Sequence, residues 1–327
     1  MRPIFNPSLV NGRCGDPTVY VETLFEKHSL LFDVGEIASL SARKIQRVDQ
    51  LFVSHAHIDH FVGFDHLLRL LVGHEKTVQL YGPARLSQTS GLSVESGRKL
   101  SLRSRFRCER TRNAEFHVYH AVPAEAGLCR GAVSLTPNPC RRPLRRTVSA
   151  AILEHGTPCL AFALREAAHV NIWKNRLSEH GLPVGPWLRS LKQAVVERRA
   201  DDHLIRIDGS ATSDDRLVPL GSLRDLLTVT AGQKIAYVTD VADTPANRAA
   251  ITALVQNADI LFIEAAFAEA DVALARNRAH LTTMAAGEIA RQANVRRVEP
   301  FHFSPRYAGD EVRMLAEVMT AFRGSHA

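Results

Sequence analysis

The sequence has few cysteines and lacks any long apolar run. None of its five cysteines forms a Cys-x-x-Cys pair; they are Cys14, Cys108, Cys129, Cys140 and Cys159. This spacing excludes a disulfide framework and a zinc ribbon, and it is typical of reduced intracellular thiols. No stretch reaches the ~18 apolar residues of a membrane span, and the N-terminus has no apolar signal-peptide core. We therefore expect a soluble, cytoplasmic protein that does not enter a membrane.

Acidic residues are outnumbered by basic ones, which gives the chain of 327 residues a formal net charge of +7. The basic residues gather in two places, Arg98–Arg112 and Arg141–Arg146. A polyanionic partner such as nucleic acid would account for this excess. A solvated basic face is the alternative, and charge alone does not choose between the two.

The run Ser54-His55-Ala56-His57-Ile58-Asp59-His60 carries the strongest chemical signal. Residues 48–53 before it form an apolar run typical of a buried strand, and apolar residues recur at helical spacing over 61–71 after it. The run is therefore predicted to be a strand-to-helix turn, where α/β proteins commonly place reactive groups. Imidazoles and carboxylates are ligands that zinc accepts, and a catalytic zinc usually takes three from the protein. Four such groups suit two metals better than one.

Further metal-type side chains follow other apolar segments. Strands are predicted over 149–154, 234–240, 258–264 and 297–302, and they deliver His155, Asp240, Glu264 and His302. Strands that end at one edge of a sheet would gather these groups in a single cleft. A helix is expected after His280, capped by Thr282 or Thr283. Residues 166–205 are polar and interrupted by glycine and proline, which indicates a protruding insertion.

The motifs resemble those of the ribonuclease Z family in the metallo-β-lactamase superfamily. His-x-His-x-Asp-His, the later His155, Thr239-Asp240 and His302 follow the superfamily's ligand order. The segment His302-Phe303-Ser304-Pro305-Arg306-Tyr307 is similar to the family's His-Phe-Ser-x-Arg-Tyr signature. Residues 279–286, 263–267 and 181–192 resemble its His-x-Thr, Glu-Ala-Thr-Phe and arm motifs. The resemblance extends over nearly the whole chain.

This resemblance implies a fold and a metal centre. The fold would be a four-layer αββα sandwich of the α/β class, a single hydrolase domain over 1–327 with an arm at about 166–205. Two zinc ions would be bound, and manganese or iron would accept the same ligands. The resemblance assigns the first ion to His55, His57 and His155, the second to Asp59, His60 and His302, and Asp240 to a bridge between them.

The resemblance also implies an activity. A hydroxide shared by the two metals would attack a phosphodiester, with the 3′ side of precursor tRNA as the expected substrate. The catalytic residues would be Asp59, His280 as general acid and Glu264 as the group that orients His280. Homodimers would form, with RNA as partner. Expected substrate contacts are Ser304, Arg306, Gly185, Pro186, Arg189 and Lys192.

The chain also departs from the family pattern in its N-terminal turns. It has Asn11-Gly12-Arg13-Cys14-Gly15-Asp16-Pro17-Thr18 and Gly35-Glu36-Ile37-Ala38 where the family has glycine-rich segments. These differences leave the metal chemistry intact and keep the choice of substrate open. The alternatives are a hydrolase of small phosphodiesters such as cyclic nucleotides, a hydrolase of another ester or thioester, and a non-catalytic RNA-binding protein with a structural metal.

Overall fold

The computed structural model describes residues 4–24, 26–71, 76–83, 104–107, 114–121, 133–135, 146–207 and 216–324. Most of the basic segment 98–146 lies outside these residues. Whether it binds a polyanion or forms a solvated basic face therefore stays open. The chain divides into two compact units. The first consists of Met1–Pro143, Thr147–Leu164 and Gln233–Ala327, and the second of Leu144–Arg146 and Arg165–Gly232.

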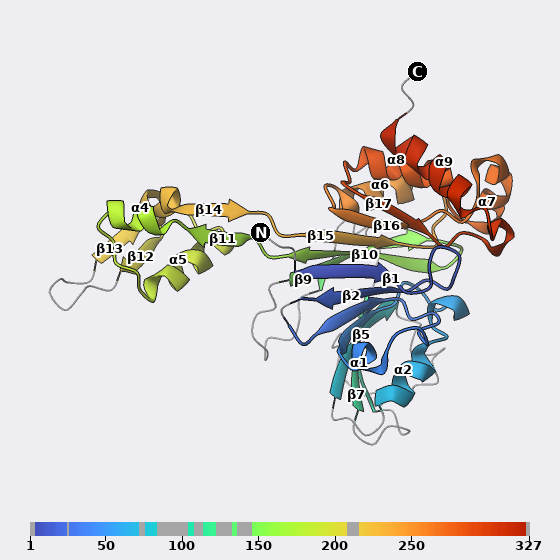
Figure 1. The fold of residues 1–327 in the computed structure, drawn as a ribbon, viewed down its shortest axis with the longest axis horizontal. Helices are drawn as coiled ribbons and strands as arrows, with labels where there is room; N and C mark the ends of the chain where they lie inside the picture. Colours follow the sequence, from blue (N-terminus) through green and yellow to red (C-terminus); the bar gives the residue numbers. More distant parts are fainter. Residues whose placement is uncertain are drawn as a thin grey trace, which may run out of the picture. The chain divides into compact units, whose positions relative to one another are not determined.

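Two sheets form the centre of the first unit (Figure 1). One begins with three antiparallel strands and continues with parallel pairing from β3 to β7. Its strand order is β1 (Phe5–Leu9), β2 (Val19–Thr23), β3 (Ser29–Phe32), β4 (Val48–Phe52), β5 (Lys76–Pro83), β7 (Ala114–Ala121) and β6 (Ser104–Arg107).

The second sheet has three neighbouring parallel strands at one side. Its order is β17 (Val298–Phe301), β16 (Ile260–Glu264), β15 (Lys234–Val238), β10 (Pro158–Glu166), β9 (Arg146–Glu154) and β8 (Val133–Leu135). Because β15, β16 and β17 run in the same direction, the residues that follow them meet at one edge. Asp240, Glu264 and His302 occupy these strand ends, as the sequence predicts.

Aromatic side chains fill the space between the two sheets. Phe32 of β3 stacks on Tyr237 of β15 with ring centroids 5.5 Å apart, and Phe52 of β4 lies 5.5 Å from Phe162 of β10. All four side chains are buried. Burial of such rings is among the largest apolar contributions to a core, so this layer fixes the two sheets against each other.

Helices cover the outer faces of both sheets (Figure 1). Ile45 of α1 (Ala42–Ile45) and Leu67 of α2 (Phe64–Leu71) belong to the apolar core on the first sheet. The apolar core on the second sheet includes residues of α6 (Pro245–Val255), α8 (Thr283–Gln292) and α9 (Glu311–Arg323). Helix α8 begins where expected, with Thr282 as its cap. The helix–sheet–sheet–helix order confirms the predicted αββα sandwich.

The second unit has its own apolar core, centred on Trp187 and Leu191. The predicted arm, 166–205, lies inside this unit, which continues to Gly232. That residues 1–327 act as one hydrolase domain stays a prediction. The elements of the second unit are β11 (His169–Ile172), α4 (Lys174–Glu179), α5 (Trp187–Val196), β12 (Leu204–Ile207), β13 (Arg216–Pro219), η2 (Leu220–Leu226) and β14 (Leu227–Thr230). The helices that the structure describes are all too short or too polar to cross a bilayer.

Candidate metal centre

The loop between β4 and α2 carries the four groups of the His-x-His-x-Asp-His motif. Its second half is a short 3-10 helix, η1 (Ile58–His60), which starts after His57. The backbone carbonyl of His60 accepts a hydrogen bond from the amide of Val34 at 2.9 Å. This bond ties the motif to the segment that follows β3. The predicted strand-to-helix turn is therefore confirmed.

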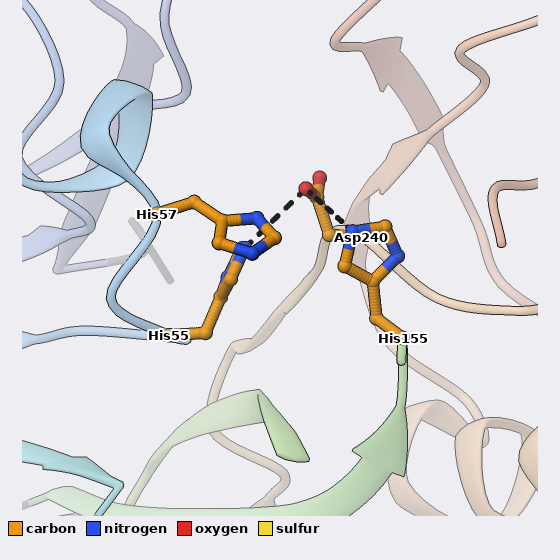
Figure 2. Close-up of side chains that lie close together, drawn as sticks. All are labelled: His55, His57, His155 and Asp240. Atoms are coloured by element: carbon orange, nitrogen blue, oxygen red, sulfur yellow. Dashed lines mark ion pairs between the residues drawn. The ribbon is translucent and has the colours of Figure 1, made fainter. Parts of the chain in front are cut away.

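Four side chains form a first cluster at the strand ends (Figure 2). Candidate ligand atoms of His55, His57, His155 and Asp240 all lie within 4.8 Å of one another. Oδ2 of Asp240 is 3.5 Å from Nε2 of His55 and 3.4 Å from Nε2 of His155. The structure thus brings together the residues that the sequence assigns to the first metal.

Asp59, His60 and His302 form a second cluster, again with candidate ligand atoms within 4.8 Å. Oδ2 of Asp59 lies 3.3 Å from Nε2 of His302 and 3.5 Å from Nε2 of His60. These are the residues that the sequence assigns to the second metal.

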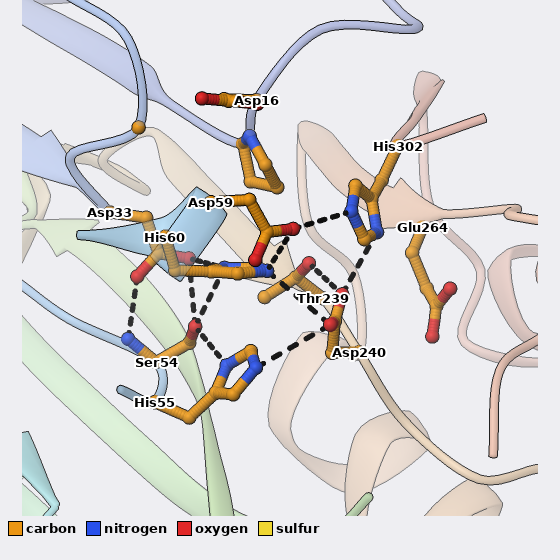
Figure 3. A network of polar contacts seen from close by, with 12 residues as sticks. Asp16, Asp33, Ser54, His55, Asp59, His60, Thr239, Asp240, Glu264 and His302 are labelled. Atoms are coloured by element: carbon orange, nitrogen blue, oxygen red, sulfur yellow. Dashed lines mark hydrogen bonds and ion pairs between the residues drawn. The ribbon is translucent and has the colours of Figure 1, made fainter. Parts of the chain in front are cut away.

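Asp240 lies between the two clusters (Figure 3). Its Oδ2 is 3.5 Å from Nε2 of His55 and 3.3 Å from Nε2 of His60, one from each cluster. Its Oδ1 is 2.9 Å from Nδ1 of His302. A carboxylate in this position is able to contact an ion in either cluster.

The histidine nitrogens give a test of whether a metal fits. Nε2 of His55 and Nε2 of His60 are buried and make no hydrogen bond within the described part of the chain. Their Nδ1 atoms do have partners, the hydroxyl of Ser54 at 3.0 Å for His55 and the carboxylate of Asp33 at 2.8 Å for His60. Ligand histidines typically show this pattern, with one nitrogen held by protein and the other left for the metal. The residues therefore fit divalent ions such as zinc.

Asp33 is a site residue that the sequence reasoning missed. Its carboxylate accepts hydrogen bonds from the Ser54 amide (2.6 Å), the Ser54 hydroxyl (2.8 Å) and the Tyr237 hydroxyl (2.7 Å), besides contacting His60 (Figure 3). Because Ser54 in turn contacts His55, one fully buried carboxylate supports a histidine of each cluster. The sequence feature that could have indicated Asp33 is its position, a carboxylate directly after the apolar strand 29–32.

Asn247 links the two loops that carry part of the first cluster. Its Nδ2 donates to the carbonyls of Glu154 (3.0 Å) and Ala242 (2.8 Å), and its Oδ1 accepts from the Glu154 amide (3.2 Å). Glu154 precedes His155, and Ala242 lies two residues after Asp240. No motif or periodicity in the sequence indicates this link.

His280 lies next to both clusters. Its ring centroid is 4.7 Å from that of His155 and 5.7 Å from that of His302. Its Nδ1 contacts Oε2 of the fully buried Glu264 at 2.9 Å. Burial would lower the pKa of His280, but the Glu264 carboxylate outweighs burial and raises this pKa above its ordinary value. The arrangement allows His280 to hold a proton near neutral pH.

The protonation of the clusters is mixed. Burial lowers the pKa of His57 and of His155, which favours the neutral imidazoles that metals bind. Burial acts against ionisation of Asp59, but hydrogen bonding from His302 holds its pKa at about 2. Burial likewise opposes the charge on His302, whereas Asp240 raises its pKa to about 10. Protons therefore compete with a metal at His302.

The predicted substrate contacts lie in two places. Ser304 and Arg306 follow His302 in the first unit, and the Arg306 guanidinium lies 5.9 Å from the ring of Phe267 and 3.8 Å from Asp271. The other four belong to the second unit, around the start of α5, and Arg189 and Lys192 are exposed there. These four are Gly185, Pro186, Arg189 and Lys192.

Comparison with known proteins agrees with this geometry. A beta-lactamase superfamily domain model matches residues 224–303. The ribonuclease Z of Deinococcus radiodurans is 30% identical over 289 residues, 85% of this chain and 83% of the relative. The ribonuclease Z of Thermobifida fusca is 30% identical over 310 residues, 92% of this chain and 83% of the relative.

Solved structures share the fold. The metallo-β-lactamase fold protein YhfI from Bacillus subtilis has a TM-score of 0.56 at 17% identity, covering 97% of this chain and 92% of its own. The short form of human tRNase Z has a TM-score of 0.54 at 18% identity, covering 93% and 92%. The 30% identity to ribonuclease Z proteins over most of their length shows that the chain belongs to the ribonuclease Z family of the metallo-β-lactamase superfamily, and it is a metal-dependent hydrolase.

Proposed function

We propose that the chain is a dinuclear phosphodiesterase of the ribonuclease Z type. His55, His57 and His155 would hold one ion, and Asp59, His60 and His302 the other, with Asp240 shared between them. Zinc fits these ligands, as do manganese and iron. The observation that carries the proposal is a pair of buried Nε2 atoms, those of His55 and His60, one in each cluster, which have no hydrogen-bond partner among the described residues.

The bound metals would supply Lewis acidity toward a phosphate and lower the pKa of water toward neutrality. The protein contributes charge balance, because the carboxylates of Asp59 and Asp240 offset only part of the ions' charge. A net positive centre then favours one phosphodiester anion. Arg306 is exposed and follows His302, a residue of the second cluster, by four positions. Its guanidinium would add a cation for an adjacent phosphate.

His280 would donate the proton that the leaving oxygen requires. Because Nδ1 contacts Glu264, the other ring nitrogen, Nε2, is the one that would carry this proton. Glu264 fixes the ring and favours its protonated form. A positioned acid of this kind typically contributes roughly 10²–10⁴-fold to turnover.

The proposed substrate is precursor tRNA, cleaved at the 3′ side. Support comes from relatives named ribonuclease Z that match most of the chain at 30% identity, and from the net charge of +7. Exposed Arg189 and Lys192 in the second unit are suited to contact RNA phosphates. We further propose a homodimer, as for the family that the sequence resembles, and a cytoplasmic location.

The direct test is to incubate metal-loaded protein with precursor tRNA, cyclic nucleotides and a thioester in parallel. Endonucleolytic cleavage of precursor tRNA, with slow or no turnover of the others, supports the proposal. Faster turnover of cyclic nucleotides or of the thioester would assign a small substrate instead. RNA binding without cleavage of any substrate would indicate a non-catalytic RNA-binding protein.

A further inference from the structure

The N-terminal turn of residues 11–18, which differs from the family pattern, connects β1 to β2. It contacts one of the two loops that supply the second cluster directly and lies close to the other through Gly35. One loop follows β17 and carries His302, and the other is the motif loop that carries Asp59. The turn is therefore placed to act on the second metal rather than on the first.

Arg13 makes the contacts to the His302 loop. Its Nη1 donates to the carbonyl of Pro300, and its Nη2 contacts Oε2 of Glu299 at 2.8 Å. Its own carbonyl accepts a hydrogen bond from the Phe303 amide at 2.9 Å. Arg13 thus holds the backbone on both sides of His302.

His302 needs such support because its backbone conformation is energetically unfavourable. Its φ angle is +57°, in the left-handed region that residues other than glycine rarely adopt. Such a conformation persists only where the surrounding structure holds it in place. The hydrogen bond that the Arg13 guanidinium donates to Pro300 and the one that the Arg13 carbonyl accepts from Phe303 supply this constraint on the two sides of His302.

The other end of the turn lies against Gly35, which itself lies against the Asp59 loop. The hydroxyl of Thr18 accepts from the Gly35 amide at 2.9 Å. A Cβ at Gly35 would lie 2.4 Å from Cβ of Asp16 and 2.6 Å from the carbonyl oxygen of Asp59. The turn, Gly35 and Asp59 therefore meet closely, and Figure 3 includes Asp16 beside this network.

We propose that Arg13 is a positioning residue for the second metal. Its guanidinium holds Pro300 and Glu299 on one side of His302, while its backbone carbonyl holds Phe303 on the other. The guanidinium contacts, which Arg13→Met removes, keep His302 in the conformation that faces Asp59. This inference rests on the proposed two-metal function. It assigns a role to one of the positions at which this chain departs from the family pattern.

The test measures zinc affinity at each cluster separately, by competition with a chromophoric chelator. His57→Ala removes a ligand of the first cluster, and Asp59→Ala removes one of the second. With His57→Ala present, we expect Arg13→Met to weaken zinc binding about tenfold. This is the low end of the loss in metal affinity that typically follows when a residue holding a metal ligand is removed. With Asp59→Ala present, Arg13→Met should leave the zinc affinity unchanged.

Arg297 provides a matched control. It contacts the other oxygen of the same Glu299 carboxylate, Oε1 at 3.1 Å, and is well exposed. Arg297→Met should leave zinc affinity unchanged in both backgrounds, and Arg13→Lys should recover part of the loss. Equal weakening in both backgrounds, or no weakening in either, would overturn the inference. If Arg13→Met does not fold, the same comparison with Arg13→Gln, which also removes the guanidinium, decides.

The proposed function has a separate outcome. Wild-type protein that binds fewer than two zinc ions would overturn the two-metal function itself. That result is measured before any Arg13 variant is made, so the two failures are distinguishable.

Discussion

Nδ1 of His280 lies 2.9 Å from Oε2 of Glu264, whose side chain is fully buried. The second carboxylate oxygen of Glu264 accepts a hydrogen bond from the Val241 amide at 2.6 Å. Val241 follows Asp240 directly. The carboxylate that supports the proposed acid is thus fixed to the loop of the proposed bridging ligand, which couples the acid's position to the metal centre.

Replacing His280 with alanine should remove the acid and spare the metals. We expect His280→Ala to lower turnover of a phosphodiester with a poor leaving group by roughly 10²–10⁴-fold. An activated substrate with a good leaving group needs less protonation, so its turnover should fall much less. Turnover of both substrates and metal content by elemental analysis are the measurements. Equal losses on both substrates would argue against a general acid.

Asp33 should influence both clusters. Asp33→Asn keeps the size of the side chain but replaces a charged acceptor of four contacts with a neutral amide. We expect metal affinity to fall by about 10–100-fold, the range for outer partners of ligand histidines. Competition with a chromophoric chelator would measure the zinc affinity of each cluster, with His57→Ala or Asp59→Ala present to remove a ligand of the other. Loss at only one cluster would contradict the view that Ser54 transmits the support of Asp33 to His55.

Asn247 should matter for the first cluster through the backbone. Asn247→Leu keeps the approximate volume but removes all three hydrogen bonds to Glu154 and Ala242. We expect weaker zinc binding with Asp59→Ala present and no change with His57→Ala present. The control is Thr244→Ala, which removes the cap of the same helix α6, a loss of about 1 kcal/mol of stability.

If Thr244→Ala lowers the zinc affinity as much as Asn247→Leu does, the effect comes from general destabilisation of α6. Urea denaturation of the metal-free variants measures the free energy of unfolding of each. The loss of stability caused by Thr244→Ala can then be compared with that caused by Asn247→Leu.

The second unit should affect RNA and not small substrates. Replacing both Arg189 and Lys192 with alanine should weaken precursor tRNA binding and reduce its dependence on salt, because each lost phosphate contact releases about one counterion fewer. Hydrolysis of a small chromogenic phosphodiester should be unchanged. The matched control is the same loss of two charges on α1, Arg43→Ala with Lys44→Ala. Equal weakening by both pairs would indicate a general charge effect.

Much of the fold could be predicted because apolar runs mark the buried strands. The strands that deliver His155, Asp240, Glu264 and His302 are predicted to within about three residues at either end. Asp240 itself lies beyond the end of β15 and has a left-handed φ of 37°, a detail that periodicity cannot give. Strand β1 was missed, because its half-exposed Phe-Asn-Pro-Ser-Leu pattern lacks an apolar run.

The residues that support the ligands were not predictable in the same way. Asp33 precedes Val34-Gly35 and reads as an ordinary turn residue. Two of the three hydrogen bonds of Asn247 join it to Glu154, 93 residues away, and Arg13 reaches Pro300 across 287 residues. Such long-range polar contacts leave no periodic pattern, because a single side chain carries each of them. The ligands could be predicted from strand ends and motif order. The residues that support them, Asp33, Asn247 and Arg13, are recognisable only in the folded structure.

The number of metals per chain tests the central claim most directly. Elemental analysis of metal-replete wild-type protein should give two metal ions per chain, and the His57→Ala and Asp59→Ala variants should each give one. Together these values would assign one ion to each cluster. One ion or none in the wild-type protein would contradict the two-metal account.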